Sequence, residues 1–313
     1  MTGDAHAPVP ALLPARDPDG HKGTFGTVLV VGGCCADRRW MAGAPTLAAL
    51  GALRAGAGLV RVLAPDRVLP HVIGACPAAV GYAMPTDLDG DVSASDAAEA
   101  FDRAADGADA IVIGPGLGPG PGTAAVALRG VQRDDIPIVV DADALNALAQ
   151  TPDLFRDLRA RAIFTPHPGE FARLASALRI THSATNPRTR VAACQALAQR
   201  LGCVCVLKGA GTVVGDAIRA WTCGHRTPVL GTGGTGDVLA GLLGGLLAQF
   251  AGSPHALSLV DLASAGVEAH ARAGERWTAR HGADAGMLPT ELADELPGAL
   301  AELRAPTRRS GAA

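Results

Sequence analysis

The order of short apolar segments and amphipathic segments constrains the fold of this chain most strongly. Apolar runs such as residues 27–31, 110–113 and 136–140 are each followed by a segment with helical spacing of its apolar residues. Runs that are apolar at nearly every position are typical of strands buried on both faces, and strands that alternate with helices form parallel sheets. We therefore predict an α/β fold with a mostly parallel central sheet and helices on both faces.

The predicted elements cover most of the chain. Strands are predicted over residues 27–31, 59–64, 78–82, 110–113, 136–140, 162–165, 203–207, 212–215 and 218–221. Helices are predicted over residues 44–55, 66–74, 95–105, 122–133, 144–149, 169–177, 187–201, 235–250, 254–274 and 289–303. No linker or internal repeat divides these elements, so we predict one domain over residues 9–303, with disordered tails at 1–8 and 304–313.

Glycine-rich and polar segments follow several of the predicted strands. They are GGCC after Val31, GPGLG after Ile113, DADALN after Val140, TPHPGE after Phe164 and KGAGT after Leu207. In sheets of this kind ligands bind outside the carboxyl ends of the strands. The placement of these segments predicts a binding site at that edge of the sheet.

The segment GTGGTGDVLAGLLGGLLAQF, residues 231–250, indicates the chemistry. The N–H groups of Gly234, Thr235 and Gly236, at the start of a helix, can form an anion hole. Asp237 beside them can take a proton from a hydroxyl, and an anion hole next to a base suits phosphoryl transfer to an alcohol. The alternatives are a glycine-rich turn before a packed helix, and an Asp237 that only favours the helix dipole.

The same segment also satisfies the dinucleotide fingerprint G-x-G-x-x-G. A Rossmann oxidoreductase is disfavoured because the motif lies late in the chain and follows only a weak predicted strand, residues 228–230. Residues 253–257, about 20 positions on, also contain no acidic residue for a ribose. A Walker A loop is excluded because Asp237 stands where Lys would follow the last glycine.

Other charged residues near the predicted edge have two interpretations each. Asp141 and Glu170 could approach Mg²⁺ through water, although Glu170 could instead bond the first turn of its helix. Asp143 could hold Mg²⁺ together with Asp141, but it is expected to cap the helix that follows it. Lys208 is expected to pair with a nucleotide phosphate, or else to be a solvated hairpin lysine.

Histidines and the remaining glycine loop complete the candidate residues. His167, held between two prolines, suits the orientation of a polar substrate group, and Gly116 lets the backbone approach a ligand. In HKGTFGT, Lys22 could meet a phosphate and His21 a ribose or carboxamide, or the segment is a polar turn. We interpret His270 as a packing residue.

Composition excludes several classes of protein. A net charge of −3 and 3% aromatic residues argue against nucleic-acid binding. The longest apolar run, residues 238–248, is too short for a membrane span, and no signal peptide is visible. Seven cysteines without a C-x-x-C pair favour a reducing cytoplasm, and Cys203 and Cys205 are expected on one face of a strand.

Taken as an ordered set, the motifs resemble the ADP/ATP-dependent NAD(P)H-hydrate dehydratase family of the ribokinase-like superfamily. The matching segments are LLPARDPDGHKGTFGT, GAP…ALRAGAGLV, VIGPGLG, VVDADALNAL, TPHPGE, VLKGAGTVV, GTGGTGDVLAGLLGGLLAQ and GMLPTELADELP. Each motif is weak alone, but the set covers nearly the whole chain in order.

The resemblance implies repair of hydrated NADH or NADPH. ADP or ATP, with Mg²⁺, would phosphorylate the ring hydroxyl of the S epimer, and loss of phosphate would restore the dihydronicotinamide. It implies that the adenine nucleotide is held by Lys208, Gly209, Ala210, Gly211, Thr212 and Gly236. It implies that the hydrated cofactor is held by Ala44, Gly116, His167 and Asp237, with Asp237 as the base.

The resemblance also implies a homo-oligomer such as a tetramer and functional pairing with a separate NAD(P)H-hydrate epimerase. The chain departs from the family at Thr227 and Val229, where Asn and Gly are common. This departure bears on nucleotide preference or rate. The alternatives are a ribokinase-like kinase of a vitamin precursor such as hydroxyethylthiazole, and a non-catalytic nucleotide-binding protein of this fold. The sequence does not show whether ADP or ATP is the phosphoryl donor, nor whether NADH hydrate or NADPH hydrate is the substrate.

Overall fold

A single sheet organises the computed structural model, which describes residues 9–36, 39–252 and 257–304. Nine strands lie in the order β3-β2-β1-β4-β5-β6-β7-β8-β9. They are β1 (Thr27–Val31), β2 (Leu59–Pro65), β3 (Val80–Met84), β4 (Ala110–Ile113), β5 (Ile138–Val140), β6 (Ala162–Phe164), β7 (Val204–Leu207), β8 (Val213–Gly215) and β9 (Ala220–Thr222). Neighbouring strands are parallel from β3 to β7 along this order. Strand β8 is antiparallel to both of its neighbours, β7 and β9. The predicted α/β fold with a mostly parallel sheet is confirmed.

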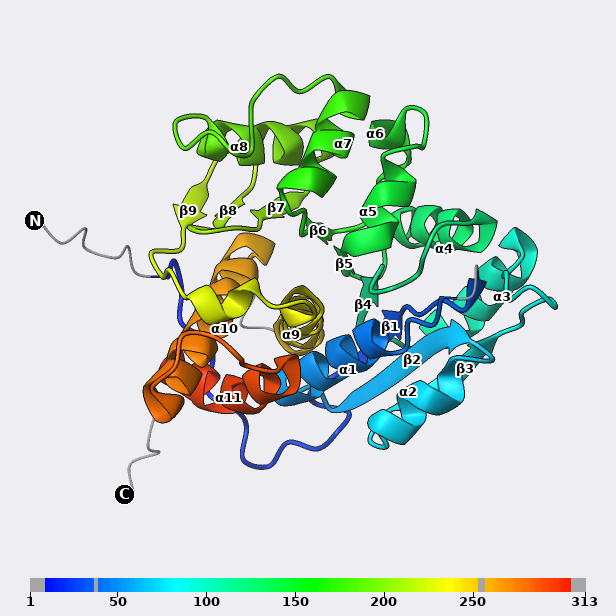
Figure 1. Ribbon diagram of the computed structural model, residues 1–313, viewed down its shortest axis with the longest axis horizontal. Coiled ribbons are helices and arrows are strands. Elements are labelled where there is room, and N and C mark those ends of the chain that lie inside the picture. The colour runs from blue at the N-terminus through cyan, green and yellow to red at the C-terminus, as the bar shows by residue number, and fades with distance from the viewer. Residues whose placement is uncertain (1–8, 37–38, 253–256, 305–313) are drawn as a thin grey trace, which may run out of the picture.

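Helices cover both faces of the sheet (Figure 1). They are α1 (Gly43–Ala55), α2 (Leu69–Ala75), α3 (Ala94–Ala105), α4 (Pro121–Val131), α5 (Ala142–Leu148), α6 (Leu154–Asp157), α7 (Pro168–Leu178), α8 (Arg190–Leu201), α9 (Thr235–Phe250), α10 (Leu259–His281) and α11 (Pro289–Glu302). Val28 and Val30 of β1 pack in a core with α1, α2, α9, α10 and α11. Leu29 and Val31 pack in a second core with α3 to α8. This alternation is the two-residue period of a strand buried on both faces.

Helix α9 lies at the centre of its layer, and glycines let it approach its neighbours closely. A Cβ on Gly241 would lie 1.9 Å from the carbonyl oxygen of Ala48 in α1, and a Cβ on Gly244 would lie 2.3 Å from Val112 in β4. Only glycine fits the first contact without moving the backbone of α1, and the second without moving the Val112 side chain. The packing therefore fixes the position of α9 against both α1 and the sheet.

Most predicted elements agree with the structure within a few residues, and the differences have local causes. Residues 228–230 form a 3₁₀ helix, Pro228–Gly231, and not the predicted strand, because Leu230 N–H closes a turn onto Thr227 O. Helix α10 extends past Gly274 to His281, where Gly282 adopts φ +64°. Its predicted start at residues 254–256 lies outside the described residues.

The ends of the predicted domain are partly described. Arg304, placed in the C-terminal tail from the sequence, forms an isolated bridge with Leu13. The predicted tails at residues 1–8 and 305–313 lie outside the part of the chain that the structure describes.

The cysteines and the apolar helices show no sign of a disulfide or a membrane segment. All seven cysteines are buried with free thiols. Cys203 and Cys205 pack in the same core, beneath α8, so the prediction that they share a face is confirmed. Among the described helices, none combines the length and hydropathy that crossing a membrane requires.

Candidate active site

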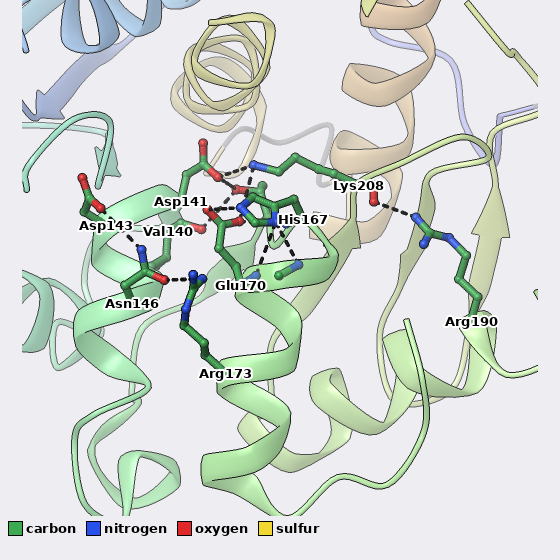
Figure 2. A network of polar contacts seen from close by, with 11 residues as sticks. Val140, Asp141, Asp143, Asn146, His167, Glu170, Arg173, Arg190 and Lys208 are labelled. Atoms are coloured by element: carbon green, nitrogen blue, oxygen red, sulfur yellow. Dashed lines mark hydrogen bonds and ion pairs between the residues drawn. The ribbon is translucent and has the colours of Figure 1, made fainter. Parts of the chain in front are cut away.

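The ends of β5, β6 and β7 bring a buried charge pair together (Figure 2). Lys208 Nζ lies 2.6 Å from Asp141 Oδ1, and the Thr165 hydroxyl donates a hydrogen bond of 2.8 Å to the same oxygen. The Lys208 side chain is only 19% exposed. The interpretation of Lys208 as a solvated hairpin lysine is therefore wrong.

A second carboxylate lies close to this ammonium group. Lys208 Nζ is 3.9 Å from Glu170 Oε2, and Glu170 is buried like Asp141. Burial alone would lower the pKa of Lys208, but the charges of Asp141 and Glu170 outweigh burial, so this pKa is raised. Burial, with a contribution from Asp141, raises the pKa of Glu170 to about 7 even though Lys208 opposes the shift. Lys208 thus stays charged between two acidic groups.

The glycine turn places Asp237 beside this cluster. Gly234 precedes α9 with φ +95°, and Asp237 lies in the first turn of the helix. A Cβ on Gly236 would lie 3.6 Å from Lys208 Nζ, so the turn and the ammonium group are neighbours. Burial, followed by the charge of Asp141, raises the pKa of Asp237 to about 7. Asp237 is therefore a carboxylate that can accept a proton near neutral pH.

The predicted anion hole is only partly free to bind an anion. Thr235 donates its hydroxyl to Leu230 O and Thr232 O at 2.8 and 2.9 Å, and its N–H lies 3.4 Å from Thr232 O. Thr235 therefore braces the loop. The N–H of Gly236 belongs to the first helical turn, where amides have no acceptor within the helix.

His270, from α10, holds the same turn by a hydrogen bond to its main chain. Its Nε2 lies 2.8 Å from Thr235 O, and because a carbonyl only accepts, Nε2 must donate. Burial lowers the pKa of His270 to about 4, so the ring is neutral at pH 7. His270 is buried as expected of a packing residue, and it also bonds the main chain next to Gly236.

Gly234 offers a direct test of this turn. A Cβ there would lie 2.7 Å from Leu47 Cδ1 and 2.9 Å from Pro289 Cγ, at a φ that L residues rarely adopt. We expect Gly234→Ala to lower the free energy of unfolding by about 1–3 kcal/mol and to lower activity by displacing Asp237. The matched control is Gly233→Ala, because nothing lies within 4 Å of its Cβ position. Thermal unfolding of both variants checks this, and equal melting temperatures would contradict it.

His167 and Glu170 close the first turn of α7. The His167 Nδ1 accepts hydrogen bonds from the N–H groups of Gly169 and Glu170, and Glu170 Oε2 accepts from the His167 N–H at 2.7 Å. The expectation that Glu170 bonds the first turn of its helix is confirmed. The His167 side chain remains 51% exposed at the edge of the site. Burial and the charge of Lys208 lower its pKa.

Asp143 does not cap α5. The N-cap residue is Asp141, and the Asp143 Oδ2 accepts a hydrogen bond of 2.9 Å from the Gly118 N–H. The intervening Ala142 has φ +49°, which is unusual for a residue with a Cβ. This backbone turn aims Asp141 at Lys208 and Asp143 at the glycine loop after β4. The capping prediction is wrong because α5 begins at Ala142, two residues before the predicted start, so Asp143 lies within the first helical turn.

The two small residues predicted to hold the hydrated cofactor are neighbours. Gly116 has φ +64°, and a Cβ on it would lie 3.0 Å from the Cβ of Ala44. Ala44 lies in the first turn of α1, whose Leu47 contacts Gly234. The loop after β4, the start of α1 and the start of α9 therefore form one surface.

A pocket of about 420 Å³ opens beside the Lys208 loop. It is lined by residues of the loop after β7, the start of α9, the segment before it, and α10, among them Lys208, Gly209, Ala210, Thr212, Gly236 and His270. Five of the six residues predicted to hold a nucleotide line this pocket. The sixth, Gly211, points its carbonyl toward Arg190.

Comparisons with known proteins give this arrangement a family. A family model described as NAD(P)H-hydrate dehydratase matches residues 28–298. The chain belongs to the NAD(P)H-hydrate dehydratase family. A bifunctional NAD(P)H-hydrate repair enzyme, Nnr, from Salinibacter ruber is 42% identical over 95% of this chain and 52% of that protein. The chain thus spans about half the length of the curated relatives that it matches.

Solved structures of this family and superfamily share the fold. An ADP/ATP-dependent NAD(P)H-hydrate dehydratase from Bacillus subtilis is 31% identical, with a TM-score of 0.70 over 93% of this chain and 95% of that chain. A ribokinase-like superfamily protein from Enterococcus faecalis V583 is 25% identical, with a TM-score of 0.71 over 94% and 93% of the two chains. The predicted ribokinase-like fold is confirmed.

The segment HKGTFGT, residues 21–27, lies away from the site. His21 and Lys22 precede β1, at the amino end of the sheet, where a Cβ on Gly58 would lie 1.8 Å from Lys22 O. Asp237 and Lys208 lie at the carboxyl end. Within one chain, Lys22 and His21 therefore cannot reach a ligand bound at this site, and the interpretation that they do so is wrong.

The carboxylates proposed for Mg²⁺ do not fit direct coordination by both. Lys208 Nζ already lies between Asp141 and Glu170, at 2.6 and 3.9 Å. No cluster of three or more potential metal ligands occurs in the described part of the chain. A metal at this point would have to displace the ammonium group or remain separated by water.

Some site residues were missed from the sequence. From the sequence, Thr165 was predicted only as a strand end, His270 only as a packing residue, and Arg190 only as part of the helix over residues 187–201. A signal existed for Thr165, which opens the polar segment TPHPGE directly after a buried strand. Nothing local indicated Arg190, because its partners come from other segments.

Proposed function

We propose that the chain dehydrates the S epimer of hydrated NADH or NADPH, with ADP or ATP as phosphoryl donor. The observation that carries the proposal is Asp237, whose pKa is raised by burial to about 7, in the first turn of α9 beside the Lys208 ammonium group. Family membership supports the substrate. The Salinibacter repair enzyme and the ADP/ATP-dependent Bacillus dehydratase support the reaction and the nucleotide.

The first step is phosphorylation of the ring hydroxyl. As the hydroxyl oxygen bonds to the terminal phosphorus, the phosphoanhydride bond breaks and Asp237 accepts the hydroxyl proton. Lys208 and the Gly236 N–H lie where they can offset the charge on the moving phosphoryl group. The residues act mainly by positioning and electrostatics, because such a transfer needs little covalent help from the protein.

The second step is elimination of phosphate. Phosphate is a better leaving group than hydroxide, and the lone pair of the ring nitrogen assists the break of the carbon–oxygen bond. Loss of a neighbouring ring proton then restores the dihydronicotinamide. Ala44, Gly116 and His167 would hold the hydrated ring on the other side of Asp237 from the nucleotide pocket. Gly116 packs tightly against Ala44, because a Cβ on Gly116 would lie 3.0 Å from the Ala44 Cβ, so a larger residue at either position would displace the loop from α1.

Mg²⁺ is proposed only as a companion of the nucleotide. The Bacillus relative was crystallised with ATP and Mg²⁺. Mg²⁺ commonly binds substrate phosphates and keeps several waters, which agrees with Asp141 and Glu170 reaching it through water. When bound, it would offset phosphate charge.

A turnover assay tests the proposal. Purified protein is given the S epimer of NADH hydrate, Mg²⁺ and either ADP or ATP, and the near-ultraviolet absorbance of reduced nicotinamide is followed. Recovery that requires nucleotide supports dehydration and identifies the donor, and the same assay with NADPH hydrate compares the substrates. No recovery with either nucleotide would refute it. A phosphorylated vitamin precursor would then favour the kinase alternative, and binding without turnover a non-catalytic protein.

The pH profile provides a further prediction. Because Asp237 must be ionised to accept a proton, we expect kcat/KM to rise with pH and to reach half its plateau near pH 7. The charge of Glu170 helps to raise the pKa of Asp237, so Glu170→Gln should shift the midpoint to lower pH. Gln keeps an oxygen for the His167 N–H. A profile that is flat from pH 5 to 9, or a midpoint that rises in Glu170→Gln, would contradict this assignment.

Three further expectations remain predictions. They are assembly as a homo-oligomer such as a tetramer, functional pairing with an epimerase that supplies the S epimer, and a cytoplasmic location. Light scattering of the purified protein measures the first, and turnover of the R epimer with and without added epimerase tests the second.

A further inference from the structure

Arg190, the first residue of α8, lies behind the loop that we assign to the nucleotide. Its guanidinium group donates hydrogen bonds to Ala184 O at 2.6 Å, Leu207 O at 2.8 Å and Lys208 O at 2.7 Å, with a longer contact of 3.4 Å to Gly211 O. Its hydrogen-bond acceptors in the described part of the chain are all main-chain carbonyls. One side chain thus ties the loop before α8 to the end of β7 and to the hairpin loop.

These hydrogen bonds decide which way the peptide groups of the loop face. In a trans peptide the C=O of one residue and the N–H of the next point in opposite directions, and the described chain has no cis peptide bond. The Leu207 carbonyl faces Arg190, and the Lys208 N–H accordingly faces the other way, onto Pro166 O at 2.9 Å. By the same geometry, the Gly209 and Thr212 N–H groups face away from the guanidinium group.

The pocket is lined by the loop and not by the guanidinium group. Gly209 and Thr212 line it, whereas Arg190 does not. Figure 2 shows Arg190 on the far side of the Lys208 main chain from Asp141. Backbone N–H groups that converge on a concave surface bind anions.

The glycine at position 209 is part of the same arrangement. Gly209 has φ +144°, and a Cβ there would lie 2.8 Å from Arg190 Nη2. The missing side chain therefore lets the guanidinium group reach the Lys208 carbonyl while the loop keeps a backbone shape that L residues avoid.

We propose that Arg190 is a positioning residue that orients the Gly209 and Thr212 N–H groups toward the nucleotide phosphates. It acts through the main chain and does not itself touch the ligand. This inference rests on the proposed binding of the nucleotide by residues 208–212. It predicts a selective loss of affinity for the phosphate part of the nucleotide when the planar guanidinium group is removed.

The test measures Kd for ADP by calorimetry and for adenosine by competition with ADP. Arg190→Lys keeps the charge but not the planar fork, so it cannot reach all the carbonyls at once. We expect its Kd for ADP to rise about tenfold or more, and its Kd for adenosine to change less than about twofold. Arg190→Gln, which keeps two amide N–H donors, is a second variant. Its Kd for ADP should lie between the values for the unchanged protein and for Arg190→Lys.

The matched control is Arg61→Lys. Arg61 also donates to two main-chain carbonyls, those of Ala104 and Asp106, but it does so at the amino end of β2, away from the pocket. We expect this variant to bind ADP like the unchanged protein. Amide hydrogen exchange over residues 207–213 should increase in Arg190→Lys and not in Arg61→Lys.

The outcomes separate the two proposals. If the unchanged protein binds ADP and Arg190→Lys binds it equally well, the role of Arg190 is refuted and the nucleotide site stands. If Arg190→Lys weakens ADP and adenosine to the same extent, the loss reflects a general change of the pocket, and the role is also refuted. If the unchanged protein binds neither ADP nor ATP, both the nucleotide assignment and this inference fall.

Discussion

Asp237→Asn is expected to lower kcat by about 10²–10⁴-fold, because the variant cannot accept the hydroxyl proton during phosphoryl transfer. The amide has nearly the same shape as the carboxylate, so the first turn of α9 should be preserved. The Kd for ADP, measured by calorimetry, should stay within about threefold, because the pocket residues are unchanged. Retention of most of the activity would show that Asp237 is not the base.

Thermal unfolding of the same variant gives an independent measurement. The folded-state pKa of Asp237 is about 7, above the ordinary value of 3.8, because burial disfavours its charge. The stability that this group contributes is therefore fully present below pH 3.8 and is lost as the pH rises through 7. We expect Asp237→Asn to melt at a higher temperature than the unchanged protein at pH 8, with little difference at pH 4. A lower melting temperature at pH 8 would contradict the raised pKa.

Lys208→Met is expected to destabilise the fold strongly. It would leave Asp141, which is 2% exposed, and the equally buried Glu170 without their shared ammonium group. Breaking such a buried pair typically costs about 3–5 kcal/mol, which corresponds to a fall in melting temperature of roughly 10 °C. The loss should be largest above pH 7 and smaller at pH 5, because the stranded carboxylates can take up protons as the pH falls. ADP binding should also be lost.

The double variant Lys208→Met with Asp141→Asn is the control for this prediction. The Asn side chain can still accept the Thr165 hydrogen bond, which is 2.8 Å long in the structure, without leaving a negative charge buried. We expect it to recover part of the lost stability but none of the lost ADP affinity. If Lys208→Met melted at the same temperature as the unchanged protein at every pH, the buried charge pair would be of no energetic importance.

Local patterns were enough to predict most of the fold. Strand β1 and helix α9 match their predicted bounds, because an unbroken apolar run and a long apolar segment after a glycine turn each favour one structure. The 3₁₀ helix Pro228–Gly231 and the end of α10 were missed. The helix predicted over residues 254–274 ended at Gly274, but α10 continues past this glycine, whose Cβ position lies 3.0 Å from Thr227 Cγ2, so Gly274 allows close packing against the 3₁₀ segment.

The candidate site was predictable in its location and less so in its contacts. The rule that ligands bind at the carboxyl ends of parallel strands placed Asp141, His167, Lys208 and the α9 turn at one edge, and the structure brings them together. The capping role predicted for Asp143 was wrong, and the segment that contains Lys22 forms the polar turn that was its alternative interpretation. The hydrogen bond from Gly118 to Asp143 depends on the strained turn at Ala142, and the distance of Lys22 from the site depends on the direction of β1.

The sequence by itself determined the order of the elements, and it was enough to propose the edge of the sheet for the site and Asp237 as the candidate base, because these follow from short-range periodicity and from residue chemistry. Only the tertiary structure decided that Lys208 pairs with Asp141, 67 positions away in the sequence. Only the tertiary structure also decided that Arg190 holds the main chain of the loop after β7, which lines the pocket. It also decided that Asp237 and Glu170 have pKa values of about 7. Burial and the separation of charges depend on how distant segments pack, and no local pattern in the chain encodes them.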